Sequence, residues 1–223
     1  MPRPLLEIIA LDAADARAAQ EGGADRIELV SDMGRSGLSP DLATFEAVRA
    51  VVDLPIRTML RLDGGFAADE LEGVRHTATA LRSAGADEFV LGFLDERGAV
   101  DVPAVRAVLE VLDGCSWTFH RALDHAADRA AAWPAIEGLP GLDFVLTAGA
   151  PTGVGDGVSV LVADAAAGTG TRVLAGGGLR QPHLAPLLAA GVDAFHTGSA
   201  VRPGGRWDVP VDAVLVRQWR AYL

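Results

Sequence analysis

A short segment near the middle of the chain combines residue types that could carry chemistry. From Cys115 to Phe119 apolar and polar residues alternate with a period of two, which predicts a β-strand with one apolar and one polar face. His120, Arg121 and Asp124 follow where this strand ends, and in parallel α/β folds ligands bind at that end. The segment therefore predicts a site that transfers a proton and holds an anion. The alternative interpretation is a core histidine, His120, held by Asp124 in a structural pair.

The same alternation places further charged side chains inside the predicted fold. In the segment 25–30, Ile27 and Leu29 would pack against helices, so Arg26 and Glu28 would face the interior. Burial of a charge is costly unless the charge is paired, so the interior charges form either a structural ion-pair network or an active site. The predicted interior charges are Glu7, Arg26, Glu28, Arg57, Arg61, His120 and His196, and the predicted catalytic residues are Glu7, Glu28, His120 and Asp124.

Two glycine-rich segments follow two late strands of the predicted fold. A triple glycine comes directly after the strand 172–175, and a Gly-Ser pair comes after the strand 194–197. Backbone N–H groups of such loops often bind phosphate in α/β barrels, although a triple glycine alone is equally consistent with a tight turn. The predicted anion-binding residues are Arg61, Arg121, Gly177, Gly178, Gly198 and Ser199.

The elements that must position these residues alternate along the whole chain. About eight strands are each followed by a helix, which demands a parallel sheet and favours a closed (β/α)8 TIM barrel over a doubly wound open sheet. No linker divides the chain, so residues 1–223 are predicted to form a single domain. The other strands are predicted at 5–10, 25–30, 56–61, 88–92, 144–147, 172–175 and 194–197, and the helices at about 12–21, 40–52, 67–84, 102–112, 126–136, 158–167, 182–190 and 211–222, with a loop at 153–157.

Composition limits the partners that this chain can have. The 223 residues carry a net charge of −11, which disfavours nucleic acid and anionic membranes as partners. The expected ligand, a small anionic molecule, follows instead from the interior arginines and the glycine-rich segments. No apolar run reaches the roughly 18 residues of a membrane span, and the N-terminus lacks signal-peptide features, so a cytoplasmic location is expected. A homo-oligomer is also expected. Asp12 and Asp15 are interpreted as solvated cap and first-turn charges, and His76, His125 and His183 as surface residues.

Several segments resemble the signature segments of the CutC copper homeostasis family over about residues 5–200. They are Leu6-Glu7-Ile8, Gly23 to Leu29, Gly37-Leu38-Ser39-Pro40, Thr118 to Asp124 and Leu146 to Gly149. The resemblance implies a (β/α)8 barrel and a cytoplasmic role in copper homeostasis or copper binding, and copper as a cofactor rests on this resemblance only.

The chain departs from the family pattern at positions that matter for copper. Many relatives carry cysteines where this chain has Ile8, Ile9 and Val30, and their Arg-Pro-Arg-Gly-Gly segment is Arg61 to Gly65 here. Cu(I) prefers soft sulfur ligands, and the single cysteine lies at the start of a strand while the three methionines are scattered, so we predict no tight Cu(I) binding. Three functions stay open: a copper protein with a His/carboxylate site, a copper-independent acid–base enzyme acting on a small anionic metabolite, and a non-catalytic homo-oligomeric barrel.

Overall fold

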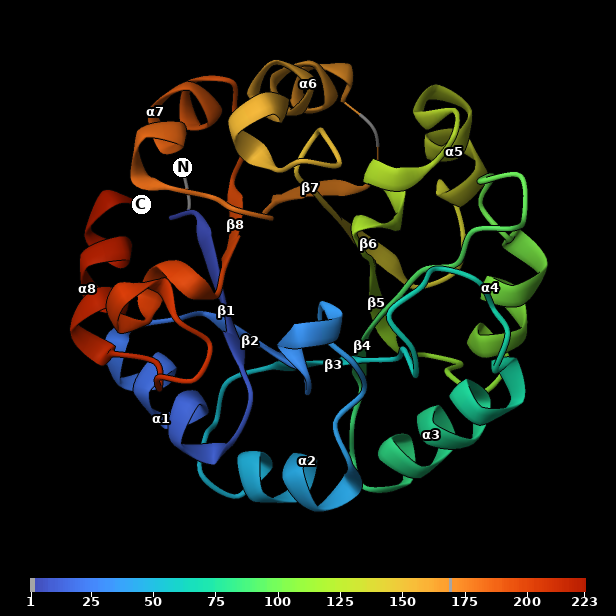
Figure 1. Cartoon of the computed structure of the whole chain (residues 1–223), viewed down its shortest axis with the longest axis horizontal. Helices are drawn as coiled ribbons and strands as arrows, with labels where there is room; N and C mark the ends of the chain where they lie inside the picture. Colours follow the sequence, from blue (N-terminus) through green and yellow to red (C-terminus); the bar gives the residue numbers. More distant parts are fainter. Residues whose placement is uncertain (1–2, 169) are drawn as a thin grey trace.

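The computed structural model describes residues 3–168 and 170–223, and it confirms the predicted (β/α)8 barrel. Residues 1, 2 and 169 lie outside this description. The expectation that the N-terminus lacks a signal peptide therefore falls partly on residues that the structure does not describe. The strands pair in chain order and the last pairs with the first (Figure 1). They are β1 (Leu5–Ala10), β2 (Arg26–Leu29), β3 (Ile56–Met59), β4 (Glu88–Leu91), β5 (Ser116–Phe119), β6 (Leu142–Thr147), β7 (Arg172–Ala175) and β8 (Ala194–Thr197).

Eight α-helices of the described residues form an outer ring around these strands (Figure 1). Aspartate side chains accept a hydrogen bond from the first turn of several helices, which explains part of the acidic composition. No helix of the described residues is long and apolar enough to cross a membrane. The helices are α1 (Ala13–Gly22), α2 (Leu42–Arg49), α3 (Leu71–Ser83), α4 (Val102–Leu109), α5 (Arg129–Ile136), α6 (Val154–Ala167), α7 (Gln181–Ala189) and α8 (Ala213–Tyr222), with short 3-10 turns η1 (Met33–Arg35), η2 (Arg121–His125), η3 (Ser199–Val201) and η4 (Pro203–Gly205).

The expected loop at 153–157 is wrong, because α6 already begins at Val154. Its glycines suggested a loop, but Gly157 is needed for close packing: a Cβ at this position would overlap the carbonyl oxygen of Ala148, just after β6. Glycine here therefore lets the first turn of α6 approach the end of β6. The interpretation of Asp15 as a solvated charge is also wrong, since Asp15 is buried and pairs with Arg202 beside α8.

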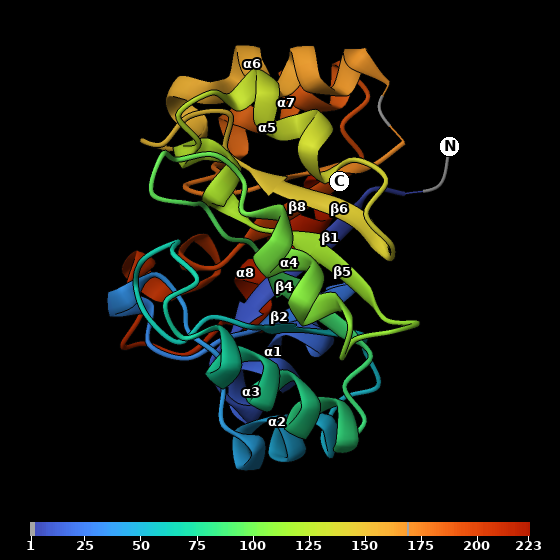
Figure 2. The ribbon, with the colours of Figure 1, turned by 90° about the vertical axis from the view of Figure 1, so that its right-hand side faces the viewer.

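The interior of the barrel is lined by alternate residues of each strand, while the intervening residues pack under the helices. An apolar cluster of Ile9, Val30, Met59 and Val90 lies toward the C-terminal ends of the first four strands. A second cluster, which includes Phe144, is formed by residues of the last three strands. Charged side chains share this interior, where Arg26 and Arg57 lie 4.4 Å and 5.3 Å from the centre of the Phe144 ring. The loops that follow β2, β3 and β8 extend from one side of the barrel, which is the C-terminal mouth (Figure 2).

Candidate functional site

A cavity of about 540 Å³ opens at the C-terminal mouth of the barrel. Its wall combines strand ends with the loops that follow them, as expected for a ligand site of this fold. All six predicted anion-binding residues line the cavity, and so do Glu28 and His120. Glu7 lies deeper in the barrel and Asp124 lies behind the wall, so neither lines it. The structure therefore gathers most of the predicted site residues in one place.

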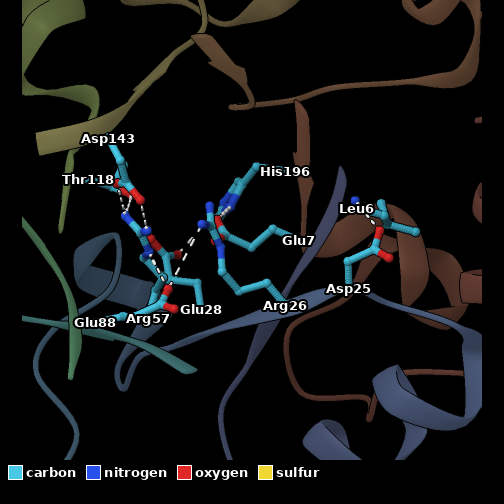
Figure 3. Close-up of polar contacts among 10 residues, drawn as sticks. All are labelled: Leu6, Glu7, Asp25, Arg26, Glu28, Arg57, Glu88, Thr118, Asp143 and His196. Carbon is cyan, nitrogen blue, oxygen red and sulfur yellow. Dashed lines mark hydrogen bonds and ion pairs between the residues drawn. The ribbon is translucent and has the colours of Figure 1, made fainter. Parts of the chain in front are cut away.

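Glu7 is the centre of a buried ion-pair cluster beneath the cavity. Strand pairing sets it beside Arg26 of β2 and His196 of β8, and its carboxylate accepts hydrogen bonds from Arg26 Nε and, at 2.8 Å, from His196 Nδ1 (Figure 3). Burial raises the pKa of Glu7, but the positive charges of Arg26, His196 and Arg57 outweigh burial and lower the pKa to about 2. Glu7 is therefore an ionised, structurally paired carboxylate.

Glu28 differs from Glu7 although both side chains are buried. Burial raises the pKa of Glu28 to about 7, and the neighbouring negative charge of Glu7 adds to that rise against the opposing effect of His196. Its Oε2 lies 3.7 Å from His196 Nε2, and its Oε1 has no hydrogen-bond partner among the described residues. Glu28 is thus a cavity-lining carboxylate that gains and loses a proton near neutral pH.

The His120 side chain lines the same cavity and carries a buried polar atom without a partner among the described residues. Its Nδ1 accepts a hydrogen bond of 3.2 Å from the Ala122 N–H, so the ring proton lies on Nε2, which has no partner among the described residues. Burial lowers the pKa of His120 to about 3, and the nearby Arg61 charge contributes to that lowering, so the ring is neutral at pH 7. Gly92 makes room for this ring, since a Cβ there would lie 2.7 Å from His120 Nδ1.

Asp124 has a different environment from the one expected at a catalytic site. Its carboxylate accepts hydrogen bonds from the Thr147 hydroxyl, the Ala148 N–H at 2.8 Å, the Gly149 N–H at 3.2 Å and Arg121 Nε at 2.9 Å. These bonds join η2 to the end of β6 and use both oxygens. These bonds are not made to His120, so the alternative in which Asp124 holds His120 is wrong. Asp124 also has no contact with the cavity that would support a catalytic role.

The Arg61 side chain is held in position by several hydrogen bonds, unlike an unpaired interior arginine. Its guanidinium donates to the backbone carbonyls of Asp63, Gly64 and Gly65 in the loop after β3, and to Ser36 in the loop after β2 at 3.3 Å. These carbonyls solvate the positive charge without neutralising it. Arg61 therefore ties two loops together and gives the mouth a positive potential.

Backbone N–H groups complete the anion side of the cavity. Gly177 and Gly178 have φ of 93° and 76°, which glycine adopts readily. Among the described residues no backbone carbonyl accepts a hydrogen bond from the N–H groups of Gly177, Gly178 or Ser199. Arg121 packs against Gly177, where a Cβ would lie 2.7 Å from its Nε. These N–H groups remain available for a ligand.

A network of charged side chains closes the N-terminal end of the barrel, and the sequence did not indicate it. Arg57 donates to Glu88 Oε2 at 2.8 Å, to Thr118 Oγ1 at 2.7 Å and to both oxygens of Asp143 (Figure 3). A register shift between β5 and β6 accompanies the inward position of Asp143. Part of the interior charge is therefore a structural network, as the alternative interpretation held. Glu28 touches its edge through His196, at 3.7 Å, but keeps one oxygen without a partner among the described residues.

Two more features of the cavity were not predicted. His125 was expected at the surface and is exposed, yet it lines the cavity and its ring lies 4.9 Å from the Phe66 ring. The methionines were expected to be scattered, and this is wrong for Met33 and Met59, because both line the cavity and pack in one cluster. Local spacing carries no signal for either feature, since each depends on loops that fold over the mouth.

The metal-binding capacity of the site is limited by its charges. Single ligand atoms of Glu7, Glu28 and His196 lie within 4.8 Å of one another. However, Arg26 already donates to Glu7, so a cation would have to displace a guanidinium. For copper, the thioethers of Met33 and Met59 are suitable soft donors, whereas the thiol of Cys115 precedes β5 at the opposite end of the barrel.

Fold and site together define a (β/α)8 barrel protein with a polar cavity at the C-terminal ends of its strands. Within that class the chain belongs to the CutC family, whose family model matches residues 5–201. It is 35% identical to the family protein CutC of Xanthomonas campestris pv. campestris, with 87% of this chain and 82% of the relative covered. It is 32% identical to that of Klebsiella pneumoniae subsp. pneumoniae, with 91% and 81% covered.

A solved structure supports the same fold. CutC from Streptococcus agalactiae, a protein named for copper homeostasis, superposes with a TM-score of 0.80 at 20% identity, covering 87% of this chain and 98% of the other. Identity at this level shows the fold alone. The copper role attaches to the family by name, and the residues of this chain must be judged by their own chemistry.

Proposed function

We propose that this protein binds a small anionic metabolite at the mouth of the barrel and carries out acid–base chemistry on it without copper. One observation carries the proposal: Glu28 Oε1 and His120 Nε2 are buried, unpartnered among the described residues, and belong to side chains that line one cavity. Folded proteins rarely leave such atoms unsatisfied, because each costs about 1–3 kcal/mol. A bound ligand that donates to Glu28 and accepts from His120 accounts for both.

The charge of the mouth supports an anionic ligand. The chain has a net charge of −11, yet Arg61 and Arg121 line the cavity beside the free N–H groups of two glycines. Such N–H groups and guanidinium groups are the usual partners of phosphate and carboxylate. A local positive potential in an acidic protein also draws anions selectively to this opening.

The test is thermal unfolding in the presence of phosphate, sulfate and a panel of sugar phosphates. An anion that binds only the folded state stabilises it by about 2.7 kcal/mol at a hundredfold excess over Kd. For a chain of this length that corresponds to a rise of roughly 5–10 °C in the midpoint. We expect the wild-type protein to show such a rise with at least one of these anions.

Ser199 offers a matched pair of variants for this measurement. Ser199→Asp places a negative charge beside the proposed anion and is expected to abolish the rise, while Ser199→Asn has nearly the same shape without charge and is expected to retain it. The position is half-buried, so both variants should fold. If no anion stabilises the wild-type protein, or if Ser199→Asp responds as strongly as Ser199→Asn, the proposal fails.

Copper handling is the second candidate, and one observation favours it. Met33 and Met59 bring two thioethers into the cavity that His120 also lines, and thioethers suit Cu(I). The thiol of Cys115 lies at the other end of the barrel, so these donors form a weak site at best. The expected ranking is therefore anion before copper.

Two further expectations concern the whole protein in the cell. A cytoplasmic location and self-association into a homo-oligomer stay predictions. Large apolar side chains exposed on the described residues are Leu42, Val214 and Tyr222, which lie on two separate helices.

The purely structural, non-catalytic interpretation leaves the unpartnered atoms of Glu28 and His120 without explanation, and for that reason it ranks last.

A further inference from the structure

We propose that the cavity catalyses enolisation of a small α-hydroxycarbonyl compound bearing a phosphate or carboxylate, with Glu28 as the base at carbon and His120 Nε2–H as the donor to the carbonyl oxygen. This inference rests on the proposed function and names its reaction and substrate class. It starts from the two unpartnered atoms, which are complementary: one is a carboxylate oxygen that can take a proton, and the other is an N–H that can only donate.

Glu28 and His120 belong to the wall of one cavity, so a single bound substrate can meet both. Glu28 projects from β2 and His120 follows β5, on well-separated strands of an eight-stranded barrel, and both line the same cavity. A carbonyl compound placed between them can direct its oxygen to His120 and an adjacent C–H to Glu28. The anion-binding N–H groups of Gly177, Gly178 and Ser199 lie on the β7 and β8 side and would hold the other end of the molecule.

The protonation states of the two groups agree with this division of roles. A base that removes a carbon-bound proton works best with a pKa near the working pH, and burial raises the pKa of Glu28 to about 7. A neutral imidazole polarises a carbonyl by donating a hydrogen bond, as the neutral histidine of triosephosphate isomerase does. His120 is neutral at pH 7 because burial lowers its pKa to about 3.

The composition of the chain excludes a second way of activating a carbonyl group, the formation of a Schiff base with lysine. Covalent activation through a Schiff base requires a lysine amine, and the sequence contains no lysine. The single cysteine lies before β5 at the N-terminal end, so no thiol nucleophile reaches the cavity from the described residues. Hydrogen-bond activation followed by proton transfer is the chemistry that the lining side chains supply.

The proposed step is balanced without any other reactant. The Glu28 carboxylate takes the proton from the carbon next to the carbonyl, and that C–H bond breaks as an O–H bond forms on Glu28. The electron pair of the C–H bond forms a C=C bond, and the carbonyl π pair moves onto the oxygen, which His120 stabilises through Nε2–H. Return of a proton from Glu28 to the same carbon regenerates the carboxylate and the carbonyl compound, and it gives exchange when the Glu28 proton has been replaced by a deuteron from solvent. Return to the neighbouring carbon gives isomerisation, because the hydroxyl proton moves at the same time to the enolate oxygen.

The test is deuterium exchange from D₂O, followed by proton NMR, with dihydroxyacetone phosphate and hydroxypyruvate as probes. The wild-type protein is expected to exchange the carbon-bound protons of at least one probe at least a hundredfold faster than Glu28→Gln. His120→Phe should slow exchange at least tenfold, and His120→Gln, which keeps an N–H donor, should slow it less. Melting midpoints of all variants confirm that each is folded.

The pH profile provides a readout that a merely structural role would not produce. Exchange should rise with pH and reach half its maximum near pH 7, as Glu28 loses its proton. The charged groups around Glu28 are Glu7 of β1, Arg26 of its own strand, Arg57 of β3 and His196 of β8. His196 also lines the cavity; burial lowers its pKa, but the charges of Glu28 and Glu7 outweigh burial and raise that pKa, and its Nδ1 is committed to Glu7. An inflection that belongs to Glu28 should disappear in Glu28→Gln, whereas one that belongs to His196 should persist there.

Two negative outcomes separate this inference from the proposed function. If the probes raise the melting midpoint but wild type exchanges no faster than Glu28→Gln, enolisation is wrong and anion binding stands. If neither the probes nor inorganic phosphate raise the midpoint and no exchange occurs, both are wrong. Rapid exchange that persists in Glu28→Gln would also overturn the assignment of Glu28 as the base.

Discussion

At the scale of single residues, two buried glutamates of the same barrel lie in opposite electrostatic environments. Glu7 is surrounded by Arg26 and His196, which hold its pKa near 2, whereas burial dominates at Glu28 and raises its pKa to about 7. The sequence predicted that both face the interior, from strand alternation alone. It could not predict which would be ionised, because that depends on distances across strands that are remote in the chain.

This difference predicts stability changes of opposite sign. At pH 8 Glu28 is charged at a cost relative to the unfolded state, so Glu28→Gln should stabilise the protein by about 3 kcal/mol. That gain should shrink as pH falls through about 7 and vanish near pH 4.5, where the carboxyl is protonated in the folded state and half-protonated in the unfolded state. Glu7→Gln should instead cost about 3 kcal/mol at both pH 8 and roughly pH 5, since its stabilisation is lost only between pH 4.5 and about 2.

Urea unfolding of the two variants and the wild-type protein at pH 8 and about pH 5 measures these free energies. Equal effects of the two substitutions, or a Glu28→Gln gain that is the same at both pH values, would contradict the assigned environments. The paired design matters because both substitutions remove one carboxyl group from the same chain. Any difference between them reports the local surroundings and not the net charge.

At the scale of elements, strands were predicted more accurately than helix ends. The bounds of β1, β7 and β8 agree with the sequence-based ranges, because alternation and flanking glycines mark short strands clearly. The start of α6 was wrong, since its glycines resemble a loop when only local propensity is considered. The inward position of Asp143 beside Arg57 left no local pattern, because it depends on how β5 pairs with β6.

The two glycines in the first turn of α6 predict opposite responses to alanine. A Cβ added at Gly155 would meet no atom within 4 Å, so Gly155→Ala should stabilise the helix by about 0.5–1 kcal/mol. At Gly157 the Cβ would overlap the Ala148 carbonyl, so Gly157→Ala should destabilise by about 1–3 kcal/mol despite the same gain in helix propensity. Thermal unfolding of the two single variants decides this, and equal shifts would show that α6 is not packed against the end of β6 as described.

At the scale of the whole molecule, the barrel separates structural charges from the open site. Arg57, Glu88 and Asp143 close the N-terminal end, the Glu7 cluster fills the middle, and Glu28 and His120 border the cavity at the C-terminal mouth. The sequence predicted the polar interior but not this layering, which arises from the positions of the residues along their strands. The sulfur atoms of the described residues are also divided between the two ends of the barrel, which affects copper binding.

The sulfur ligands of the described residues lie at opposite ends of the barrel, so we predict no tight Cu(I) binding. Cys115 precedes β5 at the N-terminal end, where burial raises the pKa of its thiol, and Met33 and Met59 line the cavity at the other end. No set of these sulfur donors that includes a thiolate can therefore meet at one ion. Anaerobic titration against a strong Cu(I) chelator should leave the copper with the chelator for the wild-type protein. Stoichiometric retention that survives Cys115→Ala but is lost in Met59→Leu would overturn this prediction and place copper in the cavity, whereas loss of retained copper in Cys115→Ala alone would place it at the N-terminal end.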